Sequence, residues 1–215
     1  MYVPHHFATD DADGLIARLA RRWSGVLITV DEAGAPVGTH LPILWDAEKR
    51  IATGHIARAN PQWKRGPGKG LIVLSGPEAY VTPGWYPSKA EHGKTVPTWN
   101  YEAVHITGQV EWFEEPARIE AVVRELSALH EDGRRAPWAI EDAPRGYIDA
   151  LLRGIVGVAL TAERVEAKRK LSQNKSEADF TGVERGMAAS DEPMAHEMAA
   201  LMRATRAVAD EPDGN

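Results

Sequence analysis

Short segments rich in β-branched and aliphatic residues run through much of the chain, and glycine, proline or aspartate separates most of them from the next. They are residues 26–30, 39–45, 50–56, 71–75 and 78–82, followed by a longer alternating segment at 103–112 and a last one at 155–161. Short strands with turn residues between them are typical of hairpins in an antiparallel sheet. The sequence therefore predicts a β-rich fold of about six or seven strands.

Three helices are expected beside these strands, which makes the fold α+β. The first covers residues 10–23, with Asp10 as its N-cap. The second begins at Pro116, because proline suits the first turn of a helix. The third begins near Pro144, and its apolar residues are expected to face inward. Those residues are Tyr147, Ile148, Leu151 and Leu152.

The end of the chain differs from the rest in charge. Residues 176–215 carry nine acidic and three basic residues, a net charge of −6, which is the net charge of the whole chain. We therefore expect a folded domain over residues 1–175 and an acidic tail over residues 176–215. Two interpretations of the tail stay open: partial disorder, or a helix over residues 193–209 that packs on a partner subunit.

Composition excludes several classes of protein. The chain has no cysteine, so disulfides, thiolate metal sites and thiol nucleophiles are absent. A body of zero net charge is a poor match for a protein that coats nucleic acid through bulk charge. The histidines show no metal-ligand spacing, so no metal is expected. Neither a signal peptide nor a long apolar run is found, and we expect a cytoplasmic protein without a membrane span.

Polar and aromatic residues concentrate in four loops, at residues 55–64, 80–89, 96–101 and 168–175. Arginine and lysine beside hydroxyl and amide side chains suit a phosphate monoester, because they supply charge and several donors. Tryptophan and tyrosine supply faces for a flat ring. RNA bases stack on such rings too, and these aromatic residues could equally fill the core.

Several of these segments resemble a known family. The segments M-Y-V-P-H-H-F, G-H-I-A-R-A-N-P-Q-W, A-Y-V-T-P-G-W-Y-P-S-K, V-P-T-W-N-Y, A-P-W-A-I-E-D-A-P and K-L-S-Q-N-K occur in the order seen in PaiB-type FMN-binding negative transcriptional regulators. The resemblance covers residues 1 to about 185. That family is similar to the split β-barrel flavoproteins, which include pyridoxamine phosphate oxidase.

The resemblance implies a fold and a partner. The fold is a six-stranded antiparallel Greek-key split barrel with flanking helices. The resemblance further implies FMN as the cofactor and a homodimer with FMN at the subunit interface.

The resemblance also implies site residues. Arg58 is the expected phosphate ligand, with Asn60 in support, and Thr39 and His40 are expected to line the flavin. The alternatives are a surface arginine that caps a turn for Arg58 and a core histidine for His40. The other matched positions are Ser88, Lys89, Trp99, Asn100, Tyr101, Lys170, Ser172, Gln173 and Asn174. For the last four of these, a bracing role in the loops is the alternative. Thr82 and Gly84 stand where family members often carry serine.

Three functions remain open on the sequence, and the third is a flavin or haem carrier without turnover. The first is an FMN-binding negative regulator of transcription, although no helix–turn–helix and no basic recognition helix is found. The second is an FMN-dependent oxidoreductase, such as a flavin reductase or a pyridoxamine-phosphate-oxidase-like enzyme, that uses a nicotinamide donor. No residue stands out as a catalytic acid or base, so the catalytic residues are unknown. His40 and His105 are the candidates to give a proton to reduced flavin.

Overall fold

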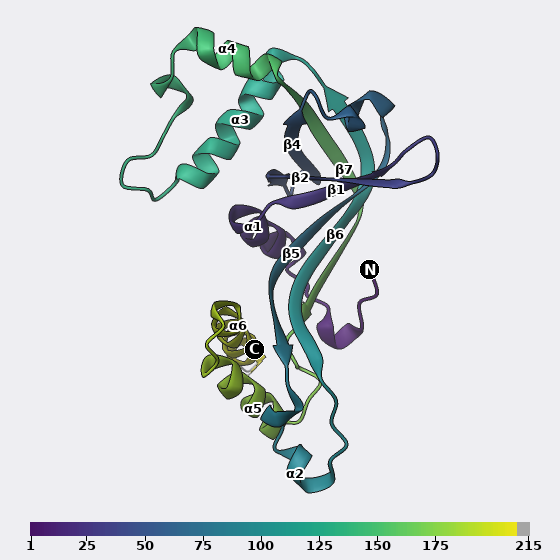
Figure 1. Cartoon of the computed structure of the whole chain (residues 1–215), viewed down its shortest axis with the longest axis vertical. Helices are drawn as coiled ribbons and strands as arrows, with labels where there is room; N and C mark the ends of the chain where they lie inside the picture. The colour runs from purple at the N-terminus through teal and green to yellow at the C-terminus, as the bar shows by residue number, and fades with distance from the viewer. Residues whose placement is uncertain (210–215) are drawn as a thin grey trace, which may run out of the picture. The chain divides into compact units, whose positions relative to one another are not determined.

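A single seven-stranded sheet organises the chain in the computed structural model, which describes residues 1–209 (Figure 1). The strands are β1 (Gly25–Val30), β2 (Pro36–Leu41), β3 (Ile43–Asp46), β4 (Ile51–Ala57), β5 (Gly68–Val81), β6 (Thr98–Phe113) and β7 (Ile155–Lys170). Their order is β2-β1-β5-β6-β7-β4-β3. Strand β1 pairs with β2 and β5, and β4 pairs with β3 and β7, all antiparallel.

The six strands that the resemblance implied are one too few, whereas the strand pattern of the sequence allowed six or seven. The described sheet has seven strands, and no pairing joins its edge strands β2 and β3. The segment at 39–45 divides into β2 and β3 at Pro42, because proline has no N–H to give to a ladder. In contrast, the segments at 71–75 and 78–82 join into the single strand β5, which continues through Gly76 and Pro77.

Three helices form where the sequence predicts them. Helix α1 (Ala12–Arg22) is capped by Asp11 instead of Asp10, and the Asp11 Oδ1 accepts a hydrogen bond of 2.9 Å from the N–H of Gly14. Helix α3 (Pro116–Glu131) begins at its proline, as predicted. Helix α4 (Arg145–Arg153) follows Pro144.

The buried face of α4 is narrower than the sequence suggests. Ile148 and Leu152 are buried, whereas Tyr147 and Leu151 are more than half exposed. Each exposed residue precedes a buried one and therefore lies about 100° around the helix from it. The prediction that Tyr147 and Leu151 face inward is wrong.

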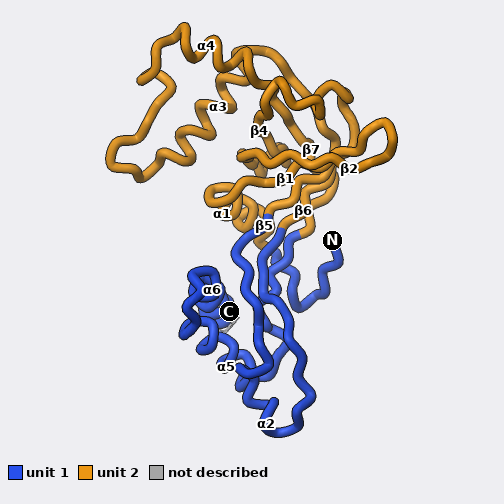
Figure 2. Tube along the Cα trace, in the orientation of Figure 1, with its two compact units in different colours: residues 1–10, 75–103, 167–215 blue, residues 11–74, 104–166 orange. Residues whose placement is uncertain are grey.

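The chain divides into two compact units (Figure 2). The first unit contains residues 1–10, 75–103 and the described residues from 167 onward; the second unit contains residues 11–74 and 104–166. The division crosses β5, β6 and β7, so each of these strands contributes to both units. The predicted boundary at residue 176 stays a prediction, and residues 210–215 of the predicted tail lie outside the described part of the chain.

The first unit has its own core, built largely by the C-terminal residues. Helices α5 (Glu177–Ala188) and α6 (Pro193–Ala209) pack against each other. The core that they form also includes the 3-10 helix Pro83–Trp85 and the end of β5. The short helix α2 (Ser88–His92) follows that 3-10 helix. Helix α6 occupies the residues of the helix that the sequence offered as one interpretation of 193–209, and its packing on a partner subunit stays a prediction. Met198 and Met202 are fully buried inside this core, together with Val183 and Met187.

Two glycines let α5 approach Trp85 closely. A Cβ at Gly182 would lie 2.1 Å from the carbonyl oxygen of Trp85, and a Cβ at Gly186 would lie 2.4 Å from its indole ring. Since both distances are far below van der Waals contact, only glycine fits at these positions. Trp85 therefore packs directly on the backbone of α5.

The second unit has a separate apolar core. Helices α3 and α4 cover it with the side chains of Ile119, Val122, Leu126, Ile148 and Leu152, which pack against Phe113 and strand residues. Strand β6 alternates as predicted, with Val104, Ile106 and Val110 buried. Within the described residues, no helix is long and apolar enough to cross a membrane.

Candidate functional site

The predicted site residues fall into both units. Thr39, His40, Arg58 and Asn60 belong to the second unit, and the other nine belong to the first.

In the second unit, Thr39 and Asn60 form a polar cluster around Gln62. The hydroxyl of Thr39 donates to Gln62 Oε1 at 2.5 Å and accepts from Asn60 Nδ2 at 2.8 Å. Gln62 is fully buried, and its amide also donates to the hydroxyl of Thr29 and the carbonyl of Val37. The sequence missed Gln62, although it lies in the loop that was singled out. Its role in the structure is to tie this loop to β1 and β2.

Arg58 is held by its own chain. Its Nε donates to the carbonyl of Arg153 at 2.7 Å, its Nη2 donates to the carbonyl of Ile155 at 3.2 Å, and its Nη1 pairs with Glu114. These contacts join β4 to the end of α4, the start of β7 and the end of β6. The guanidinium already has a neutralising carboxylate, which weakens the case for Arg58 as a phosphate ligand. Its assignment stays a prediction.

In the first unit, the K-L-S-Q-N segment forms a tight turn after β7. Ser172 has a positive φ of 67°, which is rare for a residue other than glycine. Its hydroxyl donates to Asn100 Oδ1 at 3.0 Å, and the amide of Gln173 donates to the carbonyl of Arg169 at 2.6 Å. Asn174 is exposed. Ser172, Asn100 and Gln173 therefore brace the turn.

Two lysines beside this turn have no acidic partner within residues 1–209. Lys168 is 7% exposed, and its ammonium donates to the carbonyl of Tyr2 at 3.2 Å. Lys170 donates to the hydroxyl of Thr98 at 2.6 Å and to the carbonyl of Trp99. Burial, with smaller effects from the charges of Lys168 and Lys175, lowers the pKa of Lys170. The ammonium groups therefore lie among neutral acceptors and beside like charge.

The ring of Tyr101 lies beside both lysines, and two exposed rings belong to the same unit. The ammonium of Lys168 lies 5.2 Å from the ring centre of Tyr101, and that of Lys170 lies 6.0 Å from it. Trp99 is 50% exposed and Tyr80 is 46% exposed, and their rings meet edge to face at 5.9 Å. We call Lys168, Lys170, Trp99 and Tyr101 the lysine–aromatic cluster. It combines unneutralised positive charge with an accessible ring.

Ser88 and Lys89 start the short helix α2 and differ in environment. The N–H and the hydroxyl of Ser88 both donate to Asp179 of α5, at 3.1 and 2.8 Å. Lys89 is exposed. Ser88 therefore fastens its loop to α5, while the side chain of Lys89 is accessible.

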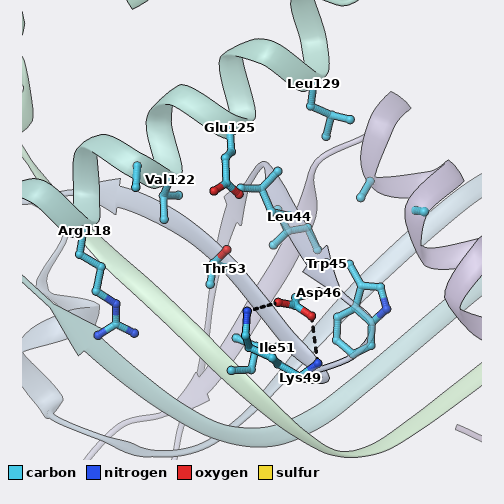
Figure 3. A pocket seen from close by; sticks show the side chains of 14 residues that line it. Leu44, Trp45, Asp46, Lys49, Ile51, Thr53, Arg118, Val122, Glu125 and Leu129 are labelled. Carbon is cyan, nitrogen blue, oxygen red and sulfur yellow. Dashed lines mark hydrogen bonds and ion pairs between the residues drawn. The ribbon is translucent and has the colours of Figure 1, made fainter.

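A cavity of about 550 Å³ lies in the second unit between α1, α3, β3 and β4 (Figure 3). Its cations are already paired: Lys49 with Asp46 at 2.7 Å, and Arg118 with Glu111. Glu125 of α3 points into it, as Figure 3 shows. None of the predicted site residues lines this cavity. A phosphate would meet no free positive charge here, so the cavity does not fit FMN.

The histidines named as proton donors lie in the second unit. His40 is exposed on β2, whereas His105 is half-buried on β6 and burial lowers its pKa. His55 was missed by the sequence, although it lies in the G-H-I-A-R-A-N segment. Its Nδ1 is buried without a hydrogen-bond partner in the described structure, and burial lowers its pKa as well. No cluster of three metal ligands is found in residues 1–209.

The lysine–aromatic cluster fits the two ends of FMN. A phosphate needs cations that are not already neutralised, and the buried ammonium of Lys168 and the half-buried one of Lys170 meet that need. A flavin ring needs an accessible aromatic face, and Trp99 offers one. The residues present in the first unit are therefore suited to this cofactor.

Comparison with protein families gives an independent result. Residues 1–164 match the model of a family described as "Putative FMN-binding domain". The protein "Protease synthase and sporulation protein PAI 2" of Bacillus subtilis is 32% identical to this chain over 206 residues, which is 94% of this chain and 96% of that protein.

Two solved structures share the fold at low sequence identity. The conserved hypothetical protein Rv2991 of Mycobacterium tuberculosis has a TM-score of 0.57 and 15% identity, covering 82% of this chain and 95% of its own. The flavocytochrome Anf3 of Azotobacter vinelandii has a TM-score of 0.56 and 14% identity, covering 82% of this chain and 76% of its own. At these identities the likeness concerns the arrangement of the chain alone.

Proposed function

The chain belongs to the FMN-binding family that also contains the PAI 2 protein of Bacillus subtilis, and we propose that it is a PaiB-type negative regulator of transcription that binds FMN. The family confirms FMN as the cofactor that the resemblance implied. We propose with it the split-barrel form of the antiparallel sheet, a homodimer with FMN at the interface, and a cytoplasmic location.

The lysine–aromatic cluster carries the proposal for how FMN is bound. Lys168 and Lys170 bind the phosphate, because two desolvated ammonium groups without a carboxylate are stabilised by an anion. Trp99 and Tyr101 contact the ring system. When bound, FMN supplies the redox chemistry, and the protein orients it and limits access of water.

The remaining predicted residues take supporting roles in this proposal. Ser172, Gln173 and Asn100 hold the turn that follows Lys170, through the hydrogen bonds given above. Ser88 fixes its loop to Asp179. Lys89, Asn174, Thr39, His40 and Asn60 are proposed as further cofactor contacts from the family resemblance. Arg58, which pairs with Glu114, is proposed to act in the fold instead.

Flavin binding by the cluster is tested by titrating FMN into the flavin-free protein and following flavin fluorescence. Lys168→Met and Lys170→Met should each weaken binding by about tenfold or more, because each removes a charged hydrogen bond. Lys94→Met is the matched control, since Lys94 is an exposed lysine of the same unit. Equal affinity in all three variants would show that the phosphate is bound elsewhere.

The dimer is tested separately by sedimentation. FMN-loaded protein should sediment at twice the mass of one chain. If the FMN-loaded protein stays a monomer at micromolar concentration, the proposed homodimer is wrong. The proposal that the lysine–aromatic cluster binds FMN would not be affected by this result.

Regulation through direct contact with DNA finds little support in the charges of α6. Arg203 pairs with Glu184, and Arg206 pairs with Glu177, so both arginines face carboxylates of α5. We therefore propose that the regulatory role depends on a partner or a flavin-derived signal. A sequence-selective, salt-sensitive shift of promoter DNA by the pure protein would contradict this.

An FMN-dependent oxidoreductase is the second candidate, and the exposed ring of Trp99 favours it. Together with Tyr80, it gives room for a second planar group such as a nicotinamide. Saturable bleaching of the flavin absorbance by NADH or NADPH would support the enzyme. Bleaching that rises linearly with the donor, without saturation, would exclude a donor site.

A further inference from the structure

Arg65 has a charged side chain that nothing in the described chain neutralises. It ends the 3-10 helix Pro61–Arg65, its Nη1 is buried without a hydrogen-bond partner, and its guanidinium forms no ion pair in the described residues. A guanidinium keeps its proton at any pH that proteins tolerate. A buried charge without a partner is costly, and in folded proteins it usually indicates a bound ion or water.

A cavity of about 200 Å³ lies against this side chain in the second unit. It is lined by Gln62 and Arg65, by Thr29 and Val30 of β1, by the Gly66–Lys69 segment, and by Val110 and Trp112 of β6. This volume is below the roughly 300 Å³ at which sites for drug-sized ligands begin. The cavity therefore suits a small molecule or ion, not a nucleotide.

The walls of the cavity are held in place by hydrogen bonds. The indole of Trp112 donates to the carbonyl of Gly66 at 3.0 Å, and Gly66 has a left-handed φ of 76°. The buried amide of Gln62 donates to the hydroxyl oxygen of Thr29 at 3.0 Å. The hydroxyl hydrogen of Thr29 is then left to donate, since no acceptor for it is found in the described residues.

The charge balance indicates a ligand with one negative charge. Lys69 also lines the cavity, but Glu163 pairs with it, and Gln109 donates to the same carboxylate at 2.9 Å. The lining of the cavity therefore carries one net positive charge, which comes from Arg65. A carboxylate neutralises it and accepts two hydrogen bonds from the planar guanidinium.

The amide of Gln62 also lines the cavity, but it already donates to Thr29 and Val37. The apolar side chains of the lining are Val30, Pro67, Val110 and Trp112. We propose that this cavity binds a small carboxylate with an apolar body, held by the Arg65 guanidinium and the Thr29 hydroxyl. None of these lining residues is among those assigned to FMN, so the proposal does not depend on the proposed function.

Calorimetric titration of benzoate into the full-length protein tests the site. Benzoate should bind, and benzyl alcohol and phenyl phosphate should each bind at least about tenfold more weakly, because one lacks the charge and the other carries excess charge. Arg65→Met should lose at least about tenfold in benzoate affinity, and Arg65→Lys should lose less. Arg135→Met, an exposed arginine of the same unit, is the control and should bind as the wild type does.

Three results would overturn the proposal. Equal benzoate affinity in Arg65→Met and Arg135→Met would show that Arg65 only binds water. Displacement of benzoate by saturating FMN would show that Arg65 binds the flavin phosphate. Should Arg65→Met not fold, the indole resonance of Trp112 in the wild type decides: it shifts on addition of benzoate if the site is real, and does not move if the site is absent.

Discussion

Arg58 in the second unit and the two lysines of the lysine–aromatic cluster in the first unit are all buried or half-buried cations, yet their surroundings differ. Arg58 meets two backbone carbonyls and the carboxylate of Glu114. Lys168 and Lys170 meet carbonyl and hydroxyl oxygens but no carboxylate in the described chain. A cation that is neutralised by a carboxylate of its own chain stabilises the fold. A cation without such a carboxylate can instead bind an anionic ligand.

The largest effect is expected from breaking the Arg58 contacts. Arg58→Met should lower the free energy of unfolding by about 3 kcal/mol, because two carbonyl hydrogen bonds and a charged pair are lost. Flavin affinity should change by less than about twofold. Urea denaturation and flavin titration measure the two quantities, with Arg135→Met as the control. A stable variant that no longer binds FMN would restore Arg58 as the phosphate ligand.

Replacing a glycine of α5 tests the packing of the first unit without changing its lysines. Gly182→Ala should cost about 2 kcal/mol, because the new Cβ would clash with the carbonyl oxygen of Trp85. This outweighs the gain of about 1 kcal/mol in helix propensity. Gly146→Ala on α4 is the control in the second unit, where a Cβ meets no atom within 4 Å, and it should be neutral or stabilising. Thermal unfolding of both variants decides, and a stabilised Gly182→Ala would contradict the close packing of Trp85.

Removing the ammonium of Lys168 or Lys170 should affect binding more than folding. The expected loss of FMN affinity of about tenfold corresponds to about 1.4 kcal/mol. The flavin-free variants should be as stable as the wild type or more so, since an unneutralised buried charge is removed. Variants that lose stability without FMN present would indicate that the lysines hold the fold, as Arg58 does.

The smallest expected effect is a dependence of stability on pH. The pKa of Lys170 is lowered below its ordinary value of 10.5 in the folded protein, mainly by burial. Between the folded-state pKa and 10.5, the unfolded chain binds more protons, so the stability of flavin-free protein should rise with pH in that window. Bound phosphate should reduce the rise by stabilising the ammonium. Urea midpoints over this window test it, and an identical slope in Lys170→Met would refute it.

Local signals in the sequence were enough to place most elements. Pro116 starts α3, and alternation identifies β6, because both depend on neighbours in the chain. Pro42 could have been used to separate β2 from β3, since proline interrupts a ladder. The continuity of β5 through Pro77 could not be predicted, because it depends on pairing with strands distant in sequence. The buried methionines of α6 likewise depend on α5 and β5.

The residue types of the candidate site could be predicted from the sequence, but the ion-pair partners of its cations could not. Arginine, lysine and aromatic residues in the right loops were recognised from the family motifs. Whether Arg58 has a carboxylate depends on Glu114, which lies 56 positions away in the chain. Arg65 had no motif to mark it, and only its unpartnered buried nitrogen does so. Whether a cation stabilises the fold or binds a ligand depends on whether a carboxylate lies beside it in the folded chain. The tertiary structure decides this, and the local sequence does not.

The left-handed backbone at Ser172 has a consequence for how the turn after β7 can be redesigned. A non-glycine residue in this conformation carries roughly 1 kcal/mol of torsional strain or more, and here the side-chain hydroxyl reaches Asn100 from inside the protein. Glycine would relieve the torsion but remove that tether, so the two changes oppose each other in free energy. Serine at this position therefore adds torsional strain but fixes the turn through its hydrogen bond. Because the two effects oppose each other, a melting curve alone would not distinguish Ser172 from glycine.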